Sequence, residues 1–498
     1  MSLWDRLFRR QAPVTPGTTD NATTADKDVV LSRQMDNLEL AERIYINNPP
    51  WLSEDKDNPL IGTNTGALVA AEIARMVTIE SKIAVENNPD VDAVIQDYVM
   101  PNLRTELEKG WALGGIVFKP YFSGATMGVT AEGLVTSIDG KMRVAFVYPS
   151  QFLIDDYDNN GAIIQIRFFS TVMQQARFFT KVETMKYNEL LNQVTITNEV
   201  FVTASAPTKY KWDDLGNTKV PLTDVKRWEN IQPNMIITNV KSALVGMYKP
   251  PMANNLNFNS PYGISPLVRA AQALRRIDIV QNAIDWEVDS SLARLIVDER
   301  SIARTDRIPK KLAKVVTRLL GDETKRFFEK WSPEIRHESY LKLLNSNKCD
   351  AEDLIGVAHG TISEAPEMAR TATEITKTRQ RTFSTVVDNQ KALEDAIRQL
   401  AYSISVWLNP TEASVEGEEL EITFDWDDSV VANPTEQLTL YMILQNAGNI
   451  PKWKTNQMFF NMDEEAAKEL IMEAQGGDGS VLSTMLDPNR PAPPRELE

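Results

Sequence analysis

One stretch of ~36 residues, 373–408, carries apolar side chains at helical spacing with no proline or glycine. Ile375, Val386, Leu393 and Leu400 recur at intervals that place them near one face of a helix. At roughly 1.5 Å per residue, such a helix spans about 54 Å. That length exceeds what a compact domain needs across its core, so the pattern indicates a component of a large assembly.

Upstream, the pattern changes twice. Two helical segments are expected between 38 and 86, the second from Ala67 to Ile83, and a further helix over 91–111. Between about 115 and 250, short β-branched and aromatic runs alternate with Gly, Asn and Asp, which predicts an antiparallel sheet region.

A helix from Ser265 to near Ala293 leads into a small α/β insert. The insert is expected to hold a strand at 293–299, a basic helix at 310–320 and an extended piece at 332–341. The remaining expected elements are a helix at about 347–359, a strand at 420–426 and helices near 434–446 and 463–474. The fold class is therefore α+β.

The amino-acid composition limits the cellular environments in which the protein is expected to occur. The chain has 498 residues, 42% of them hydrophobic, which is ample for several buried cores. It has no apolar run of the ~18 residues that a membrane span needs, and its start lacks the apolar stretch of a signal peptide. Cys349 is the single cysteine, so an intrachain disulfide is excluded. These features predict a soluble, unexported protein.

Charge is unevenly distributed over the chain, whose net charge is −16. Residues 411–498 carry 18 acidic and 5 basic side chains, whereas residues 294–330 carry 11 basic and 6 acidic ones. An acidic surface keeps a protein soluble, and it would also avoid tight contacts with the phosphates of DNA sliding past it. Both interpretations remain open for the C-terminal part.

Sequence motifs give little support to catalysis or metal binding. The common phosphate-binding and zinc-hydrolase motifs are absent, and the only histidines are His337 and His359. The segment from Asp156 to Gly161 begins like a calcium loop, but Arg167 stands where the bidentate glutamate belongs, so a tight turn is favoured. A cluster around Asp425 is interpreted as a solvated strand end. No cofactor, metal or enzymatic activity is expected.

The sequence from Arg370 to Ile375, RTATEI, with the loop before it and the long helix after it, resembles portal proteins of long-tailed phages, particularly those of Gram-positive hosts. Four further segments resemble this family in the same order: GWALGGIVFKPYF (110–122), YPSQFLIDD (148–156), NFNSPYGISPLVRAAQAL (257–274) and EITFDWDDSV (421–430). Together these segments span roughly residues 38–475.

The resemblance implies a portal-like subunit with a mixed α/β wing, two stem helices, a small α/β clip, a long wing helix after a tunnel loop, and a helical crown. The implied domains are a flexible N-terminal arm (1–34), the wing (35–262), the first stem helix (263–293), the clip (294–346), the second stem helix (347–359), the tunnel loop (360–372), the long wing helix (373–408), the crown (409–475) and a flexible C-terminal tail (476–498).

The resemblance also implies two functional surfaces. The tunnel loop would surround DNA in the channel, through Thr361, Ile362, Ser363, Glu364, Ala365, Pro366, Glu367, Met368, Ala369 and Arg370. Arg370 would either contact phosphate or pair with a carboxylate of a neighbouring loop. The clip would contact partner proteins through Arg304, Lys310, Lys311, Lys314 and Arg318, of which three fall along one face if 310–320 is helical.

The implied function is a ring at one capsid vertex, dodecameric in the family, through which double-stranded DNA is packaged and ejected. The implied partners are further copies of the chain, the DNA, the terminase large subunit, the head-to-tail adaptor, and the major capsid and scaffolding proteins, with no membrane. The protein would be assembled in the host cytoplasm and reside in the virion. Two alternatives remain: another self-assembling virion protein, such as a minor capsid or scaffold component, and an enzyme with an unfamiliar acidic site.

Overall fold

The computed structural model describes residues 24–476 apart from several short segments. These segments are 55–58, 159, 211, 213–214, 216–217, 256–259, 292–293, 299–315, 320–327, 332–335, 365–371, 412–419, 427–440, 444, 446–449 and 461–463. By compactness the chain divides into a unit that runs to Trp426 and a second that begins at Asp427.

The first described element is helix α2 (Thr24–Tyr45). The side chain of Gln34, 2% exposed, donates to the carbonyl of Gly263 at 3.5 Å and accepts from the Asn254 amide at 3.2 Å. Residues 24–34 of the expected flexible arm (1–34) are therefore helical, and Gln34 is held by tertiary contacts. Residues 1–23 lie outside the described residues.

Helices α2, α3 (Thr65–Thr78) and α5 (Leu103–Leu113) pack against one another. The expected helix over 91–111 is present as consecutive helical segments: α4 (Pro89–Val94), η2 (Ile95–Val99), η3 (Met100–Asn102) and α5. Helix α3 ends before the expected Ile83, because residues 82–85 form strand β1 (Lys82–Val85). A short turn, η1 (Pro50–Ser53), precedes α3.

The expected antiparallel sheet region is confirmed, and its described residues form two sheets. One has the order β10-β2-β3; the other has the order β4-β5-β6-β7-β8, with β9 also paired to β7. The strands are β2 (Ile116–Val129), β3 (Val135–Val147), β4 (Phe152–Tyr157), β5 (Ile163–Gln174), β6 (Arg177–Asn188), β7 (Gln193–Thr203), β8 (Lys219–Val220), β9 (Asn234–Thr238) and β10 (Gly246–Tyr248).

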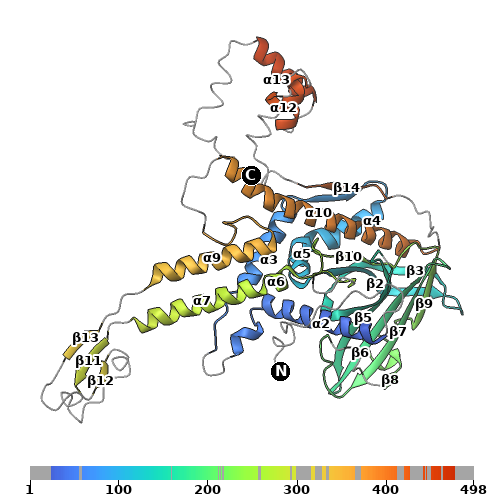
Figure 1. The fold of residues 1–498 in the computed structure, drawn as a ribbon. Coiled ribbons are helices and arrows are strands. Elements are labelled where there is room, and N and C mark those ends of the chain that lie inside the picture. The colour runs from blue at the N-terminus through green and yellow to red at the C-terminus, as the bar shows by residue number, and fades with distance from the viewer. Residues whose placement is uncertain are drawn as a thin grey trace, which may run out of the picture. The chain divides into compact units, whose positions relative to one another are not determined.

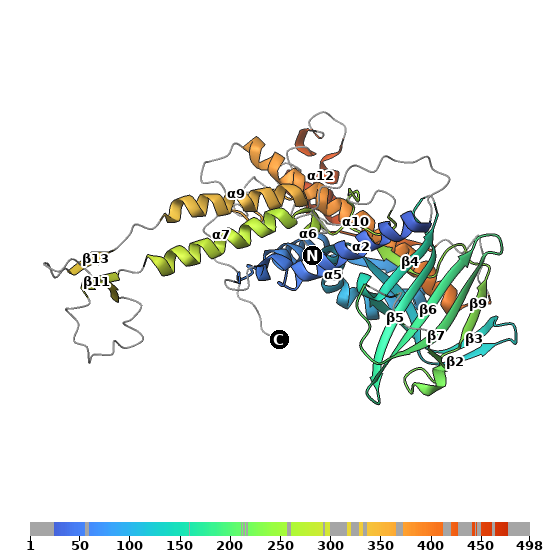
Figure 2. The same ribbon diagram turned by 60° about the horizontal axis from the view of Figure 1, so that its bottom comes forward.

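Two long helices follow the sheets, and they lie side by side (Figures 1 and 2). Ser265 caps the short helix α6 (Pro266–Arg269) by accepting from the Leu267 amide at 3.2 Å, and α7 (Ala271–Ser290) continues from it. The partner of α7 is α9 (His337–Ile355). This helix begins ten residues before the expected 347, so residues 337–341 are helical and not extended, and the expected clip boundary at 346 falls inside α9.

The described residues of the insert between α7 and α9 form three short strands, β11 (Arg294–Asp298), β12 (Val316–Leu319) and β13 (Phe328–Trp331). Strand β11 pairs in parallel with β12 and antiparallel with β13. The strand expected at 293–299 is confirmed. The helix expected over 310–320 is wrong for 316–319, where non-local pairing with β11 outweighs a helical side-chain spacing.

Helix α10 (Ala372–Leu408) confirms the long amphipathic helix. It buries Leu393, Ile397 and Leu400 completely, and it packs closely against strand β10. A Cβ added at Gly246 in β10 would lie 2.2 Å from the Ala396 carbonyl oxygen of α10, so only glycine permits this approach. None of the helices that the structure describes is long and apolar enough to span a bilayer.

Strand β14 (Ile422–Asp425) confirms the strand expected after the long helix. It pairs antiparallel with β1, with Lys82 opposite Asp425. The first compact unit therefore extends to Trp426. A crown that began at the expected residue 409 would include β14 but not β1, the strand with which it pairs. The second unit contains α12 (Lys452–Phe460), which the sequence pattern missed, and α13 (Glu464–Gly476), which contact each other.

Candidate functional site

The C-terminal end of α9 turns sharply into the loop that precedes α10. Gly356 has φ +92°, the left-handed conformation typical of a residue that ends a helix. Its amide and that of Val357 donate to the Glu352 carbonyl at 2.9 and 3.1 Å. The Thr385 hydroxyl of α10 donates to the Gly356 carbonyl at 2.6 Å. The end of α9 is thus attached directly to α10.

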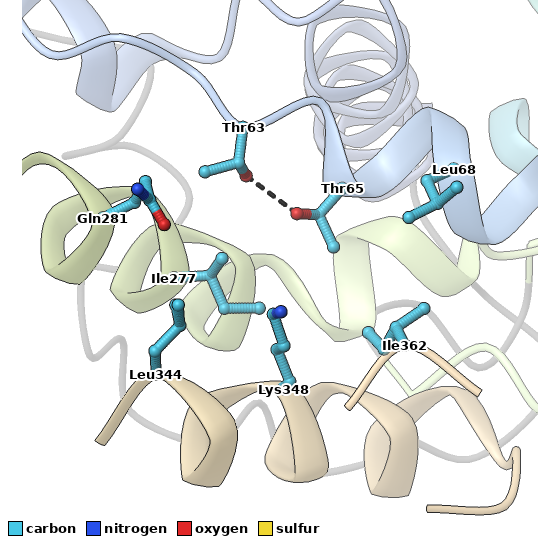
Figure 3. Close-up of a pocket in the computed structure, with 8 residues that line it drawn as sticks. All are labelled: Thr63, Thr65, Leu68, Ile277, Gln281, Leu344, Lys348 and Ile362. Carbon is cyan, nitrogen blue, oxygen red and sulfur yellow. Dashed lines mark hydrogen bonds between the residues drawn. The ribbon is translucent and has the colours of Figure 1, made fainter. Parts of the chain in front are cut away.

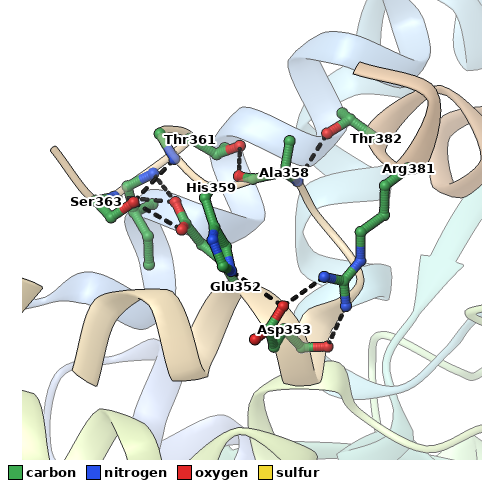
Figure 4. A network of polar contacts seen from close by, with 10 residues as sticks. Glu352, Asp353, Ala358, His359, Thr361, Ser363, Arg381 and Thr382 are labelled. Carbon is green, nitrogen blue, oxygen red and sulfur yellow. Dashed lines mark hydrogen bonds and ion pairs between the residues drawn. The ribbon is translucent and has the colours of Figure 1, made fainter. Parts of the chain in front are cut away.

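The buried carboxylate of Glu352 holds the described part of the loop (Figure 4). Its Oε1 accepts from the backbone amides of Ile362 at 2.7 Å and Ser363 at 2.9 Å, and its Oε2 accepts from the Ser363 hydroxyl at 2.7 Å. The same hydroxyl accepts from the Gly360 amide at 2.8 Å. We call the Glu352–Ser363 contacts the clasp, because they fix the loop onto α9.

A second set of polar contacts joins α9 to α10 beside the clasp (Figure 4). The Arg381 guanidinium donates to the Asp353 carboxylate and, at 2.8 Å, to the Asp353 carbonyl. His359 Nε2 lies 3.0 Å from the same carboxylate. The hydrogen bond from Arg381, and then that from His359, lower the pKa of Asp353 below its usual range. Asp353 therefore stays ionised at neutral pH.

Four of the ten expected tunnel-loop residues are described, and two of them are not free surface residues. Ser363 is 9% exposed, and Ile362 packs against the main core. Ile362 also lines a small hollow between α3, α7 and α9, together with Leu68 and Leu344 (Figure 3). Ile362 and Ser363 therefore anchor the loop to the body of the subunit.

The other described loop residues are held by local contacts. The Thr361 hydroxyl donates to the Ala358 carbonyl at 2.7 Å, and the Glu364 amide donates to the side chain of Asn345 on α9 at 2.7 Å. The remaining expected residues lie outside the described part of the chain: Ala365, Pro366, Glu367, Met368, Ala369 and Arg370.

Helices α7 and α9 run antiparallel. Arg276 pairs with Asp350 at 3.0 Å. At the other end of the helix pair, Glu287 accepts two hydrogen bonds from the Arg336 guanidinium, at 3.1 and 3.0 Å. These hydrogen bonds lower the pKa of Glu287. Large apolar side chains remain exposed on both helices: Ile279, Trp286 and Val288 on α7, and Leu341, Leu343 and Leu354 on α9.

Of the expected partner-contact residues in the insert, only Arg318 falls within the described residues. It lies in β12, in register with Val297 of β11. Because β12 is a strand, Arg318 does not share a helical face with the upstream lysines. The other four lie outside the described residues: Arg304, Lys310, Lys311 and Lys314.

The calcium-like segment forms the expected tight turn, between β4 and β5. The Asp158 carboxylate accepts from the amides of Asn160 at 2.8 Å and Ala162 at 2.7 Å, and Gly161 has φ +80°. Arg167 pairs with Asp155 at 2.7 Å. The Asp158 carboxylate, which a cation would need, is thus engaged in the turn. Of the second acidic cluster, Asp425 lies in β14, and the two following aspartates lie outside the described residues.

Sequence reasoning missed Glu352, Asp353 and Arg381. Each carries a charge on a helix, which by itself indicates only a solvated face, and no local pattern reveals their partners across the loop. A buried position for Glu352 is signalled weakly by its spacing from Ala351 and Ile355 within an amphipathic helix.

Comparison with known proteins adds an independent observation. No curated protein matches the chain. Residues 289–479 match a family model described as "Phage portal protein, SPP1 Gp6-like". The matched range begins at the end of α7 and includes the β11–β13 insert, α9, the clasp, α10, β14, α12 and α13. The resemblance to phage portal proteins inferred from the sequence is thereby confirmed for residues 289–479.

Proposed function

We propose that the chain assembles into a closed ring that serves as the portal at one vertex of a phage capsid. The observation that carries this proposal is the antiparallel pair of α7 and α9, which exposes large apolar side chains to water. Burial of these side chains against a neighbouring subunit would be favourable. A closed ring needs two different complementary surfaces on each subunit, and the two helices supply candidates for both. Ile279 and Trp286, seven residues apart, share one face of α7.

Among the exposed apolar side chains of α7, Trp286, which is 67% exposed, should contribute most to the stability of a subunit interface. A tryptophan buries roughly 200 Å² when fully enclosed, so enclosing the exposed two thirds removes about 130 Å² from water. At ~25 cal/mol per Å², this contributes about 3 kcal/mol to each subunit interface. One such side chain per interface is a substantial part of what stabilises a ring.

Within the ring, residues 360–372 other than the anchored Ile362 and Ser363 would line the channel for double-stranded DNA. The clasp supports this proposal, because it anchors the described part of the loop, up to Ser363, onto α9. Deleting 365–369 would then preserve folding, rings and capsids and reduce the DNA content of the capsid. Loss of ring assembly in this deletion would instead assign the segment to a subunit interface.

The insert between α7 and α9 would be the docking surface for the terminase motor and the head-to-tail adaptor, through its basic residues. Capsid and scaffolding proteins would contact other parts of the ring, which would reside in the virion after assembly in the host cytoplasm. No substrate is converted in this role, since the portal would act as a channel and a platform.

The proposal is tested by replacing Trp286 with serine and measuring particle mass during dilution. The control is Leu190→Ser, because Leu190 is 94% exposed in the turn between β6 and β7, away from α7 and α9. We expect the parent and the control to form the same large particle and Trp286→Ser to dissociate at about 100-fold higher concentration, the equivalent of ~3 kcal/mol.

Two results would contradict the proposal. A parent protein that stays monomeric at all concentrations would exclude the ring, and equal behaviour of the two variants would exclude α7 from the interface. A sheet-like or elongated particle would favour another self-assembling virion protein.

A further inference from the structure

Three side chains with metal-binding atoms meet at the end of α9. They are Cys349, Glu352 and His359, and their ligand atoms all lie within 4.8 Å of one another. Cys349 and Glu352 are three residues apart on α9, so they share one face of the helix. The left-handed turn at Gly356 then reverses the chain and returns His359 to that face. The cluster is therefore a product of the fold and of no sequence motif.

The imidazole of His359 is already oriented by a carboxylate. Its Nε2 lies 3.0 Å from Asp353 Oδ1, and because an ionised carboxylate only accepts, Nε2 carries the proton. This leaves the lone pair on Nδ1, the nitrogen available to a metal. A histidine that gives its other N–H to a carboxylate is the arrangement usual among metal-bound histidines, where the carboxylate fixes the tautomer and raises the basicity of the ligand.

Glu352 has capacity left for a ligand. Its side chain is fully buried, and it forms no ion pair with any residue in the part of the chain that the structure describes. A carboxylate oxygen can accept two hydrogen bonds, and Oε2 accepts one, from the Ser363 hydroxyl. A cation bound at the free position of Oε2 would compensate the buried negative charge without disturbing the clasp.

We infer that Cys349, Glu352 and His359 bind one zinc ion. A thiolate, an imidazole and a carboxylate are the ligands that Zn²⁺ prefers, and water would fill the fourth tetrahedral position. Tetrahedral binding brings ligand atoms to about 3.5 Å from one another, which the partly exposed side chains of Cys349 and His359 reach by changes of rotamer. Binding releases the thiol proton of Cys349 to solvent.

The ion would have a structural role. It would join α9 to the turn at 358–360, and so reinforce the clasp. This inference does not rest on ring formation, since all three ligands belong to one chain.

The test uses Co²⁺ added to the full-length protein, because a thiolate bound to Co²⁺ gives a charge-transfer absorption band in the near ultraviolet. The chain has a single cysteine, so such a band can come only from Cys349. We expect one Co²⁺ per chain, displacement by one equivalent of Zn²⁺, and loss of the band in Cys349→Ser. His359→Gln should weaken binding at least tenfold.

The matched control is His337→Gln, which removes the other histidine, an exposed residue at the far end of α9. This control should bind Co²⁺ like the parent. Absence of the band in the parent would overturn the inference. A band that His359→Gln leaves unchanged would also overturn it, because the thiol would then bind metal without the site. Thermal unfolding gives a second measurement: Zn²⁺ should raise the melting temperature of the parent and of His337→Gln, and not that of Cys349→Ser.

Discussion

Removing the Ser363 hydroxyl tests the clasp most simply. In Ser363→Ala, Glu352 loses the hydrogen bond to Oε2, and the Gly360 amide loses its acceptor. A hydrogen bond to a charged group contributes about 1.5–3 kcal/mol, so we expect the loop to lose about 2 kcal/mol of local stability. The two amide bonds to Oε1 remain, which is why the variant should still fold.

Hydrogen exchange followed by mass spectrometry measures this loss directly, because the amides of Ile362 and Ser363 exchange only when the clasp opens. A change of ~2 kcal/mol corresponds to about 30-fold faster exchange over residues 358–364. Ser384→Ala is the matched control, since the Ser384 hydroxyl is exposed and donates only to the Gln380 carbonyl of its own helix, at 3.0 Å. Equal exchange in the two variants would refute the clasp as the anchor of this loop.

Two further predictions concern the neighbouring contacts and the insert. In Arg381→Gln, hydrogen exchange over 358–364 should be faster than in the parent at neutral pH. Arg381, and then His359, lower the pKa of Asp353 in the folded protein. The difference in exchange should therefore persist down to about pH 4, near the ordinary aspartate pKa, and disappear as pH falls through the lower pKa of the folded state. A difference that is constant down to strongly acidic pH would contradict this reasoning. Reversing the charge of Lys310, Lys311 and Lys314 should leave particle mass unchanged and reduce DNA packaging or tail joining in an assembly assay; normal packaging and joining would exclude these lysines as a docking surface.

The local sequence pattern predicted those helices and strands whose conformation follows from the spacing of their own apolar side chains. Helix α10 was predicted to within one residue at its start, because an unbroken amphipathic period needs no partner to be recognised. The antiparallel sheets were predicted for the same reason, from alternating runs between turns. In contrast, β12 was expected to be helical, since its strand conformation depends on pairing with β11 about twenty residues earlier.

Long-range contacts explain the other differences. The pairing of β14 with β1 joins residues more than 300 positions apart, and no local signal in either strand indicates it. The first part of α2, residues 24–34, was assigned to a flexible arm because it is polar, and no local signal indicates the contacts that Gln34 makes with Gly263 and Asn254. The loop after α9 was recognised from its resemblance to portal proteins, but the roles of Glu352 and Ser363 in anchoring it required the fold.

Electron microscopy of the purified full-length protein tests the central claim most directly. Viewed end-on, the particles should be closed rings with a central channel, and all rings should have a rotational symmetry consistent with identical subunit interfaces. Monomers, open filaments or sheets without a channel would contradict the account.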